Sequence, residues 1–241
     1  MEREVDIVDQ TLKITNVLSD PTRYYIYQHI AKRHEEVTVQ EIADIFEIHP
    51  NVARLHLTKL EDVNMLVSET KKTGKGGRPS RLYRLSDAVI LLNFPYRDYQ
   101  LLSKIAIETM YSLGEAGRKA LFNTGRLFGK ELAEQHLKGL GGQDSLSFDH
   151  KLSIIKDAST TAGFYPEFVT AEDHSAIFFK IHNCPFKEIA FEQKETVCGM
   201  HQEFLRGMFN VLFDSIELIE EENMFDRAGC HACTYRLLAN H

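Results

Sequence analysis

The sequence predicts an α+β protein with an N-terminal winged helix-turn-helix domain and a C-terminal domain that mixes helices with an antiparallel sheet. Two short helical patterns separated by a tight turn lie within residues 38–64. Two segments that alternate apolar and polar residues follow, at 66–70 and 80–85. Beyond residue 99 the apolar period is first helical and later that of strands. We therefore expect domains at 1–92 and 99–241, joined by a hinge at 93–98.

Length and composition agree with this division. The chain has 241 residues, which suits one or two domains of roughly 150 residues each. Its N-terminal stretch MEREVDIVDQ is charged from the second residue, unlike a signal peptide. No apolar run approaches the roughly 20 residues that span a bilayer. We expect a cytoplasmic protein with no membrane partner, in which thiols stay reduced.

Charge is distributed unevenly along the chain. The net charge is −7, but residues 49–84 carry eight Lys or Arg against three acids. That segment is therefore +5, which leaves −12 for the remainder. A local basic segment on an acidic protein favours contact with a polyanion such as DNA, although a solvated charged hairpin has the same composition.

Capping signals define the helices of the N-terminal domain. Apolar residues at helical spacing predict a first helix: Val5, Val8, Leu12 and Leu18. Asp20-Pro21 begins a second helix, since Asp accepts a bond from a free helix N–H and Pro suits the first turn. A capping box at 38–41 begins a third, and His49-Pro50 begins a fourth. The fourth helix is expected to end at Asn64, which tolerates the left-handed conformation.

The fourth helix is predicted to read DNA. Ala53, Leu57 and Leu60 form its buried stripe. Asn can read adenine, Arg can read guanine, and an apolar side chain can contact the thymine methyl group. Leu55 could instead pack under a neighbouring loop. The candidate base-contacting residues on the opposite side, which we call the reading face, are Asn51, Arg54, Leu55, Thr58 and Lys59.

The two alternating segments predict a β-hairpin wing. Its loop is basic and glycine-rich, so it can approach phosphates or the minor groove. The glycines do not form the GxxxxGK[ST] pattern of a nucleotide-binding loop. The candidate DNA contacts of the wing are Lys71, Lys72, Lys75, Arg78 and Arg81.

Helical periodicity in the C-terminal domain predicts helices around residues 101–110, 120–132 and 152–155. A hairpin is expected at 164–169 and 176–181, then a helix that begins near Cys198, then two final strands around 216–218 and 235–237. Gly117, Gly125 and Gly129 lie on one helix stripe. Such a stripe permits close approach of a partner helix, which we expect to form the dimer contact, or alternatively lines a ligand groove.

All four cysteines lie in the last quarter of the chain: Cys184, Cys198, Cys230 and Cys233. The first two are separated by 13 residues, and the last two form a CxxC. This spacing in a chain without an export signal is typical of a thiolate metal site. Four thiolates suit zinc and an iron–sulfur cluster equally. The simplest alternative is four reduced cysteines without a metal, and His182, His201 or His231 could also serve as ligands.

The N-terminal motifs resemble a known class. The residues are Asp20-Pro21-Thr22-Arg23, then His56-Leu57-x-x-Leu60, then Gly77-Arg78-Pro79-Ser80-x-Leu82-Tyr83. Their order is similar to that of winged-helix repressors of the ArsR and DeoR type, over about 80 residues. Asn64 stands where those families usually have Gly. The resemblance implies a domain that binds double-stranded DNA.

The C-terminal motifs resemble the SufR family of regulators that sense iron–sulfur clusters. They are HNCPF at 182–186, Cys198 with Phe204-Leu205-x-Gly207-Met208, and Gly229-x-x-x-Cys233-x-Tyr235. This half is also similar to vinyl-reductase-type domains. The resemblance implies a metal-binding sensor domain with three cysteine ligands, which fall on Cys184, Cys198 and Cys233. Cys230 departs from that pattern and leaves the metal open.

Together these patterns favour a transcription regulator that binds an operator, acts as a repressor and is controlled by its metal centre. A homodimer is expected, reading half-sites about one helical turn apart. One alternative is a regulator with a structural zinc that senses a small organic effector. Another is a CxxC thiol redox or metal-dependent enzyme, but the CxxC lacks a βαβ context and we expect no enzyme.

Overall fold

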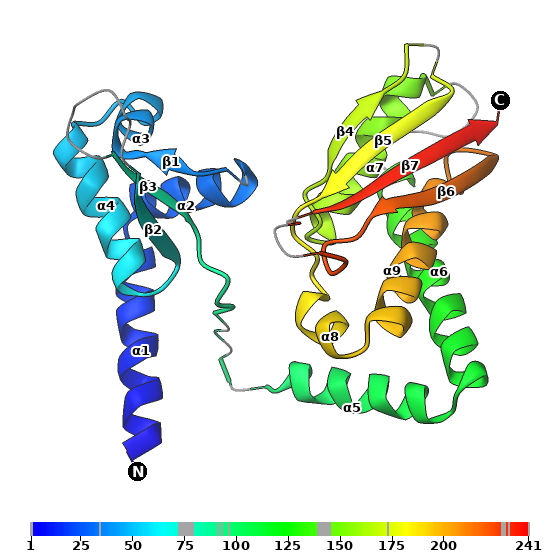
Figure 1. The fold of residues 1–241 in the computed structure, drawn as a ribbon, viewed down its shortest axis with the longest axis horizontal. Coiled ribbons are helices and arrows are strands. Elements are labelled where there is room, and N and C mark those ends of the chain that lie inside the picture. Colours follow the sequence, from blue (N-terminus) through cyan, green and yellow to red (C-terminus); the bar gives the residue numbers. More distant parts are fainter. Residues whose placement is uncertain are drawn as a thin grey trace. The chain divides into compact units, whose positions relative to one another are not determined.

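The computed structural model describes residues 2–33, 35–71, 80–90, 92, 94–95, 97–138, 146–172, 174–227, 230 and 232–240. The chain divides into two compact units, Met1–Arg97 and Asp98–His241 (Figure 1). The division falls inside the segment 93–98 to which the hinge was assigned.

The N-terminal unit combines helices with a small antiparallel sheet. Its helices are α1 (Glu2–Leu18), α2 (Pro21–Arg33), α3 (Val39–Ile45) and α4 (Pro50–Asp62). The strands β1 (Val37–Thr38), β2 (Leu66–Lys71) and β3 (Ser80–Leu85) pair in the order β1-β3-β2. The helix-turn-helix of α3 and α4 and the two wing strands are confirmed. Ile26, Ile30, Leu57, Leu60 and Tyr83 are completely buried in the core of this unit.

Local side-chain bonds explain why these helices begin where they do. The Asp20 carboxylate accepts the backbone N–H of Arg23 at 3.0 Å. The Thr38 hydroxyl accepts the N–H of Glu41 at 3.1 Å, and the Glu41 carboxylate accepts that of Thr38 at 2.6 Å, which completes the capping box. His49 Nδ1 accepts the N–H of Asn51 at 3.1 Å. Each predicted start is confirmed.

The end of α4 and the buried face of α1 can also be compared with the sequence. Asn64 has a φ of 59°, so the left-handed conformation expected after α4 is confirmed. Leu12, one of the apolar residues whose spacing predicted α1, is exposed, whereas Ile14 and Val17 are buried. Leu12 lies about 200° around the helix from Ile14 at 100° per residue, so both cannot face the same core.

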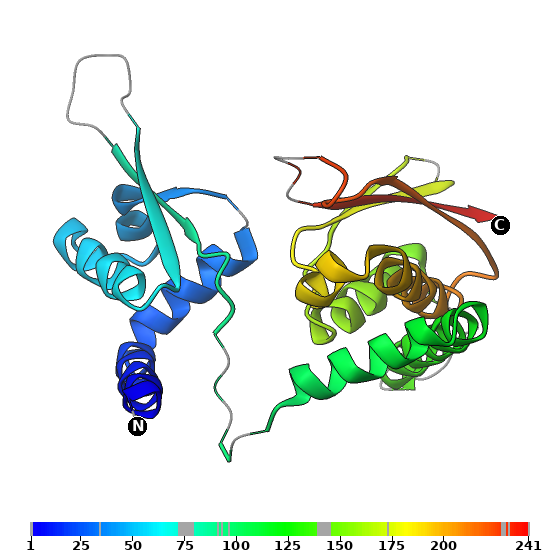
Figure 2. The ribbon, with the colours of Figure 1, turned by 60° about the horizontal axis from the view of Figure 1, so that its bottom comes forward.

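The C-terminal unit is a sheet with helices on one face. Its helices are α5 (Tyr99–Ser112), α6 (Glu115–Lys138), α7 (Phe148–Thr161), α8 (Lys187–Glu192) and α9 (Lys194–Phe209). Its strands β4 (Glu167–Thr170), β5 (Ala176–Ile181), β6 (Ser215–Glu222) and β7 (Cys233–Asn240) pair antiparallel in the order β4-β5-β7-β6. Figure 2 shows α6, α7 and α9 beneath this sheet. No helix in the described ranges combines the length and apolar character needed to cross a bilayer.

The glycine stripe of α6 faces helices of its own chain. A Cβ on Gly129 would clash with the Phe204 carbonyl of α9, and one on Gly125 would lie 2.9 Å from the Met200 carbonyl oxygen. Gly117 meets the Met110 carbonyl of α5 in the same way. Close approach to a partner helix is therefore confirmed. The expected dimer contact through this stripe is wrong, because α9 and α5 already cover it.

Candidate functional site

The described part of α4 has one buried side and one exposed side. Ala53, Leu57 and Leu60 have no exposed surface, and His56 is also buried. The reading face lies on the other side, where Asn51, Arg54, Leu55 and Lys59 are exposed and Thr58 is half-buried. Leu55 is 54% exposed, so it does not pack under a neighbouring loop of the described chain. An exposed Leu among Asn and Arg side chains suits contact with a thymine methyl group.

Two cations of the reading face differ in their surroundings. Lys59 Nζ lies 3.8 Å from the Asp62 carboxylate. Among the described side chains, no carboxylate pairs with the Arg54 guanidinium. Arg54 therefore approaches a base edge or a phosphate without first breaking an ion pair.

Two of the candidate DNA contacts in the wing already have acidic partners. Lys71 Nζ bonds the Glu36 carboxylate at 2.6 Å, and this bond raises the pKa of Lys71. Arg81 bonds both Glu61 oxygens, at 2.7 and 2.9 Å, and its Nε donates to Ser68. Lys72, Lys75 and Arg78 lie outside the described residues.

Glu61 was missed by the sequence analysis. It lies on α4 and holds Arg81 of β3, so it fixes the wing strand against the helix that carries the reading face. An acidic residue inside an otherwise basic segment was the available signal. Because Arg81 and Lys71 have acidic partners, their phosphate contacts require those ion pairs to open.

Four elements or loops position the cysteines. Cys184 follows β5, Cys198 lies on α9, Cys233 begins β7, and Cys230 precedes it by three residues. Antiparallel pairing of β5 with β7 places Ile181 opposite Cys233, which brings the first and last cysteines to the same end of the sheet. All four are free thiols, and Cys184 and Cys233 are buried.

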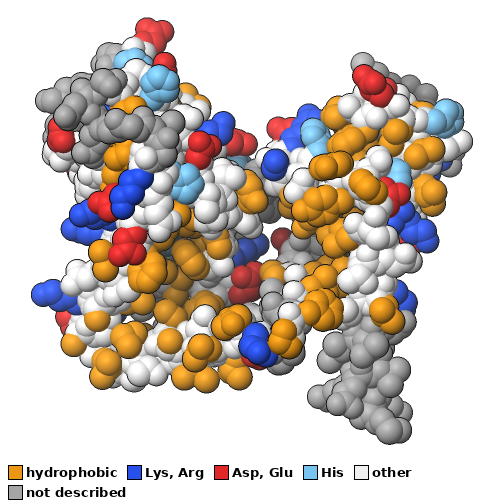
Figure 3. Space-filling view, turned by 180° about the vertical axis from the view of Figure 1, so that it is seen from behind, with side chains coloured by type: hydrophobic (Ala, Val, Ile, Leu, Met, Phe, Trp, Pro, Cys, Tyr) orange, Lys and Arg blue, Asp and Glu red, His pale blue; other side chains and the backbone are white. Residues whose placement is uncertain are grey.

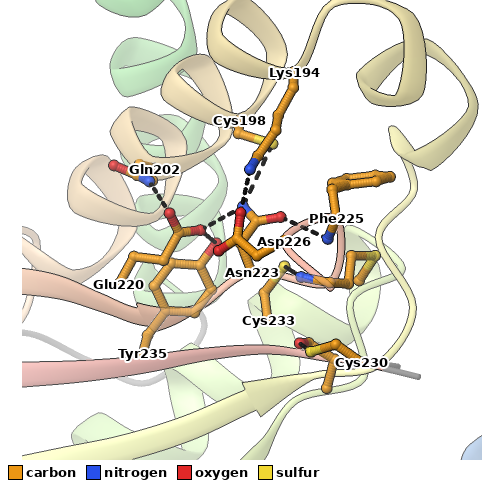
Figure 4. Close-up of polar contacts among 12 residues, drawn as sticks. Lys194, Cys198, Gln202, Glu220, Asn223, Phe225, Asp226, Cys230, Cys233 and Tyr235 are labelled. Carbon is orange, nitrogen blue, oxygen red and sulfur yellow. Dashed lines mark hydrogen bonds and ion pairs between the residues drawn. The ribbon is translucent and has the colours of Figure 1, made fainter. Parts of the chain in front are cut away.

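Three of the sulfurs accept hydrogen bonds from N–H groups. Asn223 Nδ2 donates to Cys198 Sγ at 3.8 Å, and the backbone N–H of Met224 donates to Cys233 Sγ at 3.4 Å (Figure 4). The backbone N–H of Phe186 bonds the Cys184 sulfur and opposes the rise in its pKa. Cys230 differs, because its Sγ donates to the Ala232 carbonyl at 3.2 Å. We call Cys184, Cys198 and Cys233 the three-cysteine cluster.

Burial keeps the cluster protonated. It raises the pKa of Cys184 to about 12 and that of Cys233 to about 11, and it also raises the pKa of Cys198. A negative charge on Cys233 or Cys198 would raise the pKa of Cys184 further, so these three sulfurs are electrostatically coupled. Removing three protons here requires a compensating cation, which is what a thiolate-bound metal supplies.

The metal prediction remains a prediction. Within the described residues, which include Cys184, Cys198 and Cys233, no three His, Cys, Asp or Glu side chains lie close enough together to hold one metal ion, so binding a metal would require these three sulfurs to move closer to one another. Residues 228–229 and His231, which flank Cys230, lie outside those residues. His182 Nε2 lies 3.4 Å from the Glu167 carboxylate. His201 is buried and stacks on Phe164 with ring centroids 4.7 Å apart, and burial lowers its pKa to about 4.

A polar network beside the cluster was also missed. The Glu220 carboxylate accepts bonds from Asn223 at 2.8 Å, Gln202 at 3.1 Å and the Tyr235 hydroxyl at 3.3 Å (Figure 4). Asn223 is buried, so Glu220 fixes the amide that donates to Cys198. The network joins α9, β6 and β7, and only the folded register brings these residues together.

Comparison with known proteins supports the N-terminal assignment. A family model described as a helix-turn-helix domain matches residues 18–69. No curated protein matches the chain. The match places a helix-turn-helix domain in the N-terminal unit and supports a DNA-binding transcription regulator.

Two solved structures share low similarity with the chain. A trafficking protein particle complex subunit 3 from Naegleria fowleri, covalently bound to palmitic acid, is 17% identical with a TM-score of 0.38, covering 59% of this chain and 97% of that chain. Bacillus subtilis PadR in complex with operator DNA is 15% identical with a TM-score of 0.24, covering 59% of this chain and 93% of that chain. Neither similarity is close enough to support a further conclusion.

Proposed function

We propose that this chain is a transcriptional repressor that binds operator DNA as a homodimer, and that a metal centre on its three-cysteine cluster controls this binding. The single observation that carries the DNA-binding half is the helix-turn-helix whose second helix exposes a polar and basic face. Asn51, Arg54 and Leu55 together provide the donors, acceptors and apolar surface that base edges in a major groove require.

The hydrogen bonds of the sulfurs support the choice of three cysteines over four. N–H donors stabilise a thiolate and tune a metal bound to it. Cys184, Cys198 and Cys233 each have such a donor, whereas Cys230 acts as a donor itself. A centre with three thiolate ligands and one further position fits an iron–sulfur cluster or a zinc with a fourth, different ligand.

The bound group would supply positive charge and fix three elements to one another. Cys184, Cys198 and Cys233 come from the end of β5, from α9 and from the start of β7. When thiolates replace thiols, the Asn223 and Met224 N–H groups gain charged acceptors, which strengthens their bonds. Loss of the group would return the three thiols, two of them buried, to their protonated state and release this end of the sheet.

Arg54→Ala tests the DNA-binding half. We expect specific binding to weaken by about 1–3 kcal/mol, because the guanidinium loses its bonds to a base edge. The measurement is the affinity for a duplex selected by the wild-type protein from a random-sequence pool, at one fixed salt concentration.

Arg118→Ala is the matched control, since it removes the same charge from α6 in the C-terminal unit. It should leave the affinity unchanged. An Arg54→Ala protein that is folded and binds the selected duplex as tightly as the wild type would remove Arg54 from the reading face.

A further inference from the structure

Helix α5 is apolar and yet nothing in its own unit buries it. It has 14 residues, and none of them is buried. Leu101, Leu102, Ile105 and Leu113 at its C-cap are between 54% and 61% exposed. We call these four residues the α5 face. In Figure 3, orange hydrophobic side chains gather along the lower edge of the C-terminal unit, where α5 runs.

The α5 face is one continuous stripe. At 100° per residue, its four side chains fall within an arc of about 120°. Met110 lies outside that arc and is half-buried, at the point where α5 approaches Gly117 of α6. Contact with α6 therefore uses a different side of α5 and leaves the stripe uncovered.

Both charged residues of α5 already have partners within the unit. Lys104 Nζ bonds the Glu192 carboxylate at 2.6 Å, and the Glu108 carboxylate accepts Gln193 Nε2 at 3.1 Å. Glu192 is the last residue of α8 and Gln193 follows it, so these two bonds fix α5 in place beside α8. The stripe itself carries no charge, and an uncharged apolar surface is complementary to a second copy of itself.

The exposed area is enough for a small dimer interface. With about 180 Å² for a Leu or Ile residue and about 230 Å² for Tyr, the α5 face plus the neighbouring Tyr99 exposes roughly 560 Å². Two such faces would together bury about 1,100 Å², which is above the roughly 1,000 Å² that a specific interface needs. A helix of this length is also marginal without packing on an apolar partner.

We infer that the α5 face is the self-association surface, on which α5 of a second copy packs. This inference rests on the proposed homodimer and replaces the glycine stripe as its contact. It follows from the exposed stripe, its lack of charge and its area. Two copies are also what a helix-turn-helix protein needs to contact two half-sites.

The experiment measures the mass of the full chain in solution by light scattering. We expect the wild type to have twice the 27.7 kDa of a single chain. Leu102→Glu combined with Ile105→Glu should give a single chain, because each dimer would then bury charges without partners. Both positions are exposed, so circular dichroism should show the wild-type helix content.

Val169→Glu is the matched control, because Val169 is exposed on the edge strand β4 of the same unit. It should stay dimeric. Hydrogen exchange on the wild type gives a readout without mutation, in which amides of 99–112 exchange more slowly as the protein concentration rises through dissociation.

Three outcomes would overturn the inference: a single-chain mass for the wild type, a double α5 variant that stays dimeric, or dissociation by Val169→Glu alone. A DNA-binding measurement distinguishes failure of the α5 interface from failure of the proposed DNA-binding function. A wild-type monomer that still selects and binds a duplex leaves the DNA-binding half intact, whereas a dimer that binds no duplex contradicts that half and keeps the interface.

Discussion

Serine at Cys184, Cys198 or Cys233 is expected to abolish metal binding, while Cys230→Ser should retain it. A serine hydroxyl is a poor ligand for zinc or iron in a thiolate site, so each member of the three-cysteine cluster is required. Cys230 is dispensable because its sulfur donates to the Ala232 carbonyl and has no N–H donor in the described chain that would stabilise a thiolate. Metal per chain, counted for zinc and iron on protein purified without oxygen, is the measurement.

Alanine at the same positions separates ligation from folding. A buried serine hydroxyl can itself cost about 1–3 kcal/mol, whereas alanine leaves no polar group unpaired. Cys233→Ala should therefore lose the metal as completely as Cys233→Ser. If Cys230→Ser loses the metal as fully as the other three variants, the site is a closed four-cysteine zinc site and the three-cysteine assignment is wrong.

Gly129→Ala is expected to destabilise the C-terminal unit by about 3 kcal/mol, a large effect for one methyl group. In an open helix the same change would stabilise by up to about 1 kcal/mol, because Ala has the higher helix propensity. Here the new Cβ meets the Phe204 carbonyl, and a backbone atom of α9 cannot turn aside as a side chain would. Chemical denaturation of the full chain, followed by a probe in the C-terminal unit, measures the difference.

Phe128→Ala, one residue earlier on the exposed side of α6, is the control. It should change the free energy of unfolding by less than about 0.5 kcal/mol. If Gly129→Ala stabilises the protein, α6 and α9 are not in close contact, and the glycine stripe becomes available again as a dimer surface.

The N-terminal unit was predicted more completely from the sequence than the C-terminal unit, because its signals depend on residues that are close together in the sequence. The capping box at Thr38 and the left-handed Asn64 depend on neighbours within a few residues, which the sequence displays directly. The stripe of Gly129 also predicted close helix packing. Periodicity cannot distinguish a partner helix in the same chain from one in a second copy, and so the dimer contact was misplaced.

The three-cysteine cluster shows the same limit of prediction from sequence spacing. Spacing identified four cysteines as one group, but it could not reveal which sulfurs accept N–H bonds and which donates one. That distinction depends on Asn223 and Met224, which follow β6 and reach Cys198 and Cys233 only after β6 has paired with β7. The role of Glu220 depends on the same register.

Control of DNA binding by the metal centre is tested most directly by one comparison. The affinity for the selected duplex is measured on protein with its metal and on the same sample after chelation, at constant salt. The two affinities should differ by roughly 5–150-fold, the range of a coupling free energy of about 1–3 kcal/mol between two sites. Equal affinities for the two forms, with the metal shown to be lost and both units still folded, would contradict metal control and leave a regulator whose metal, if any, is structural.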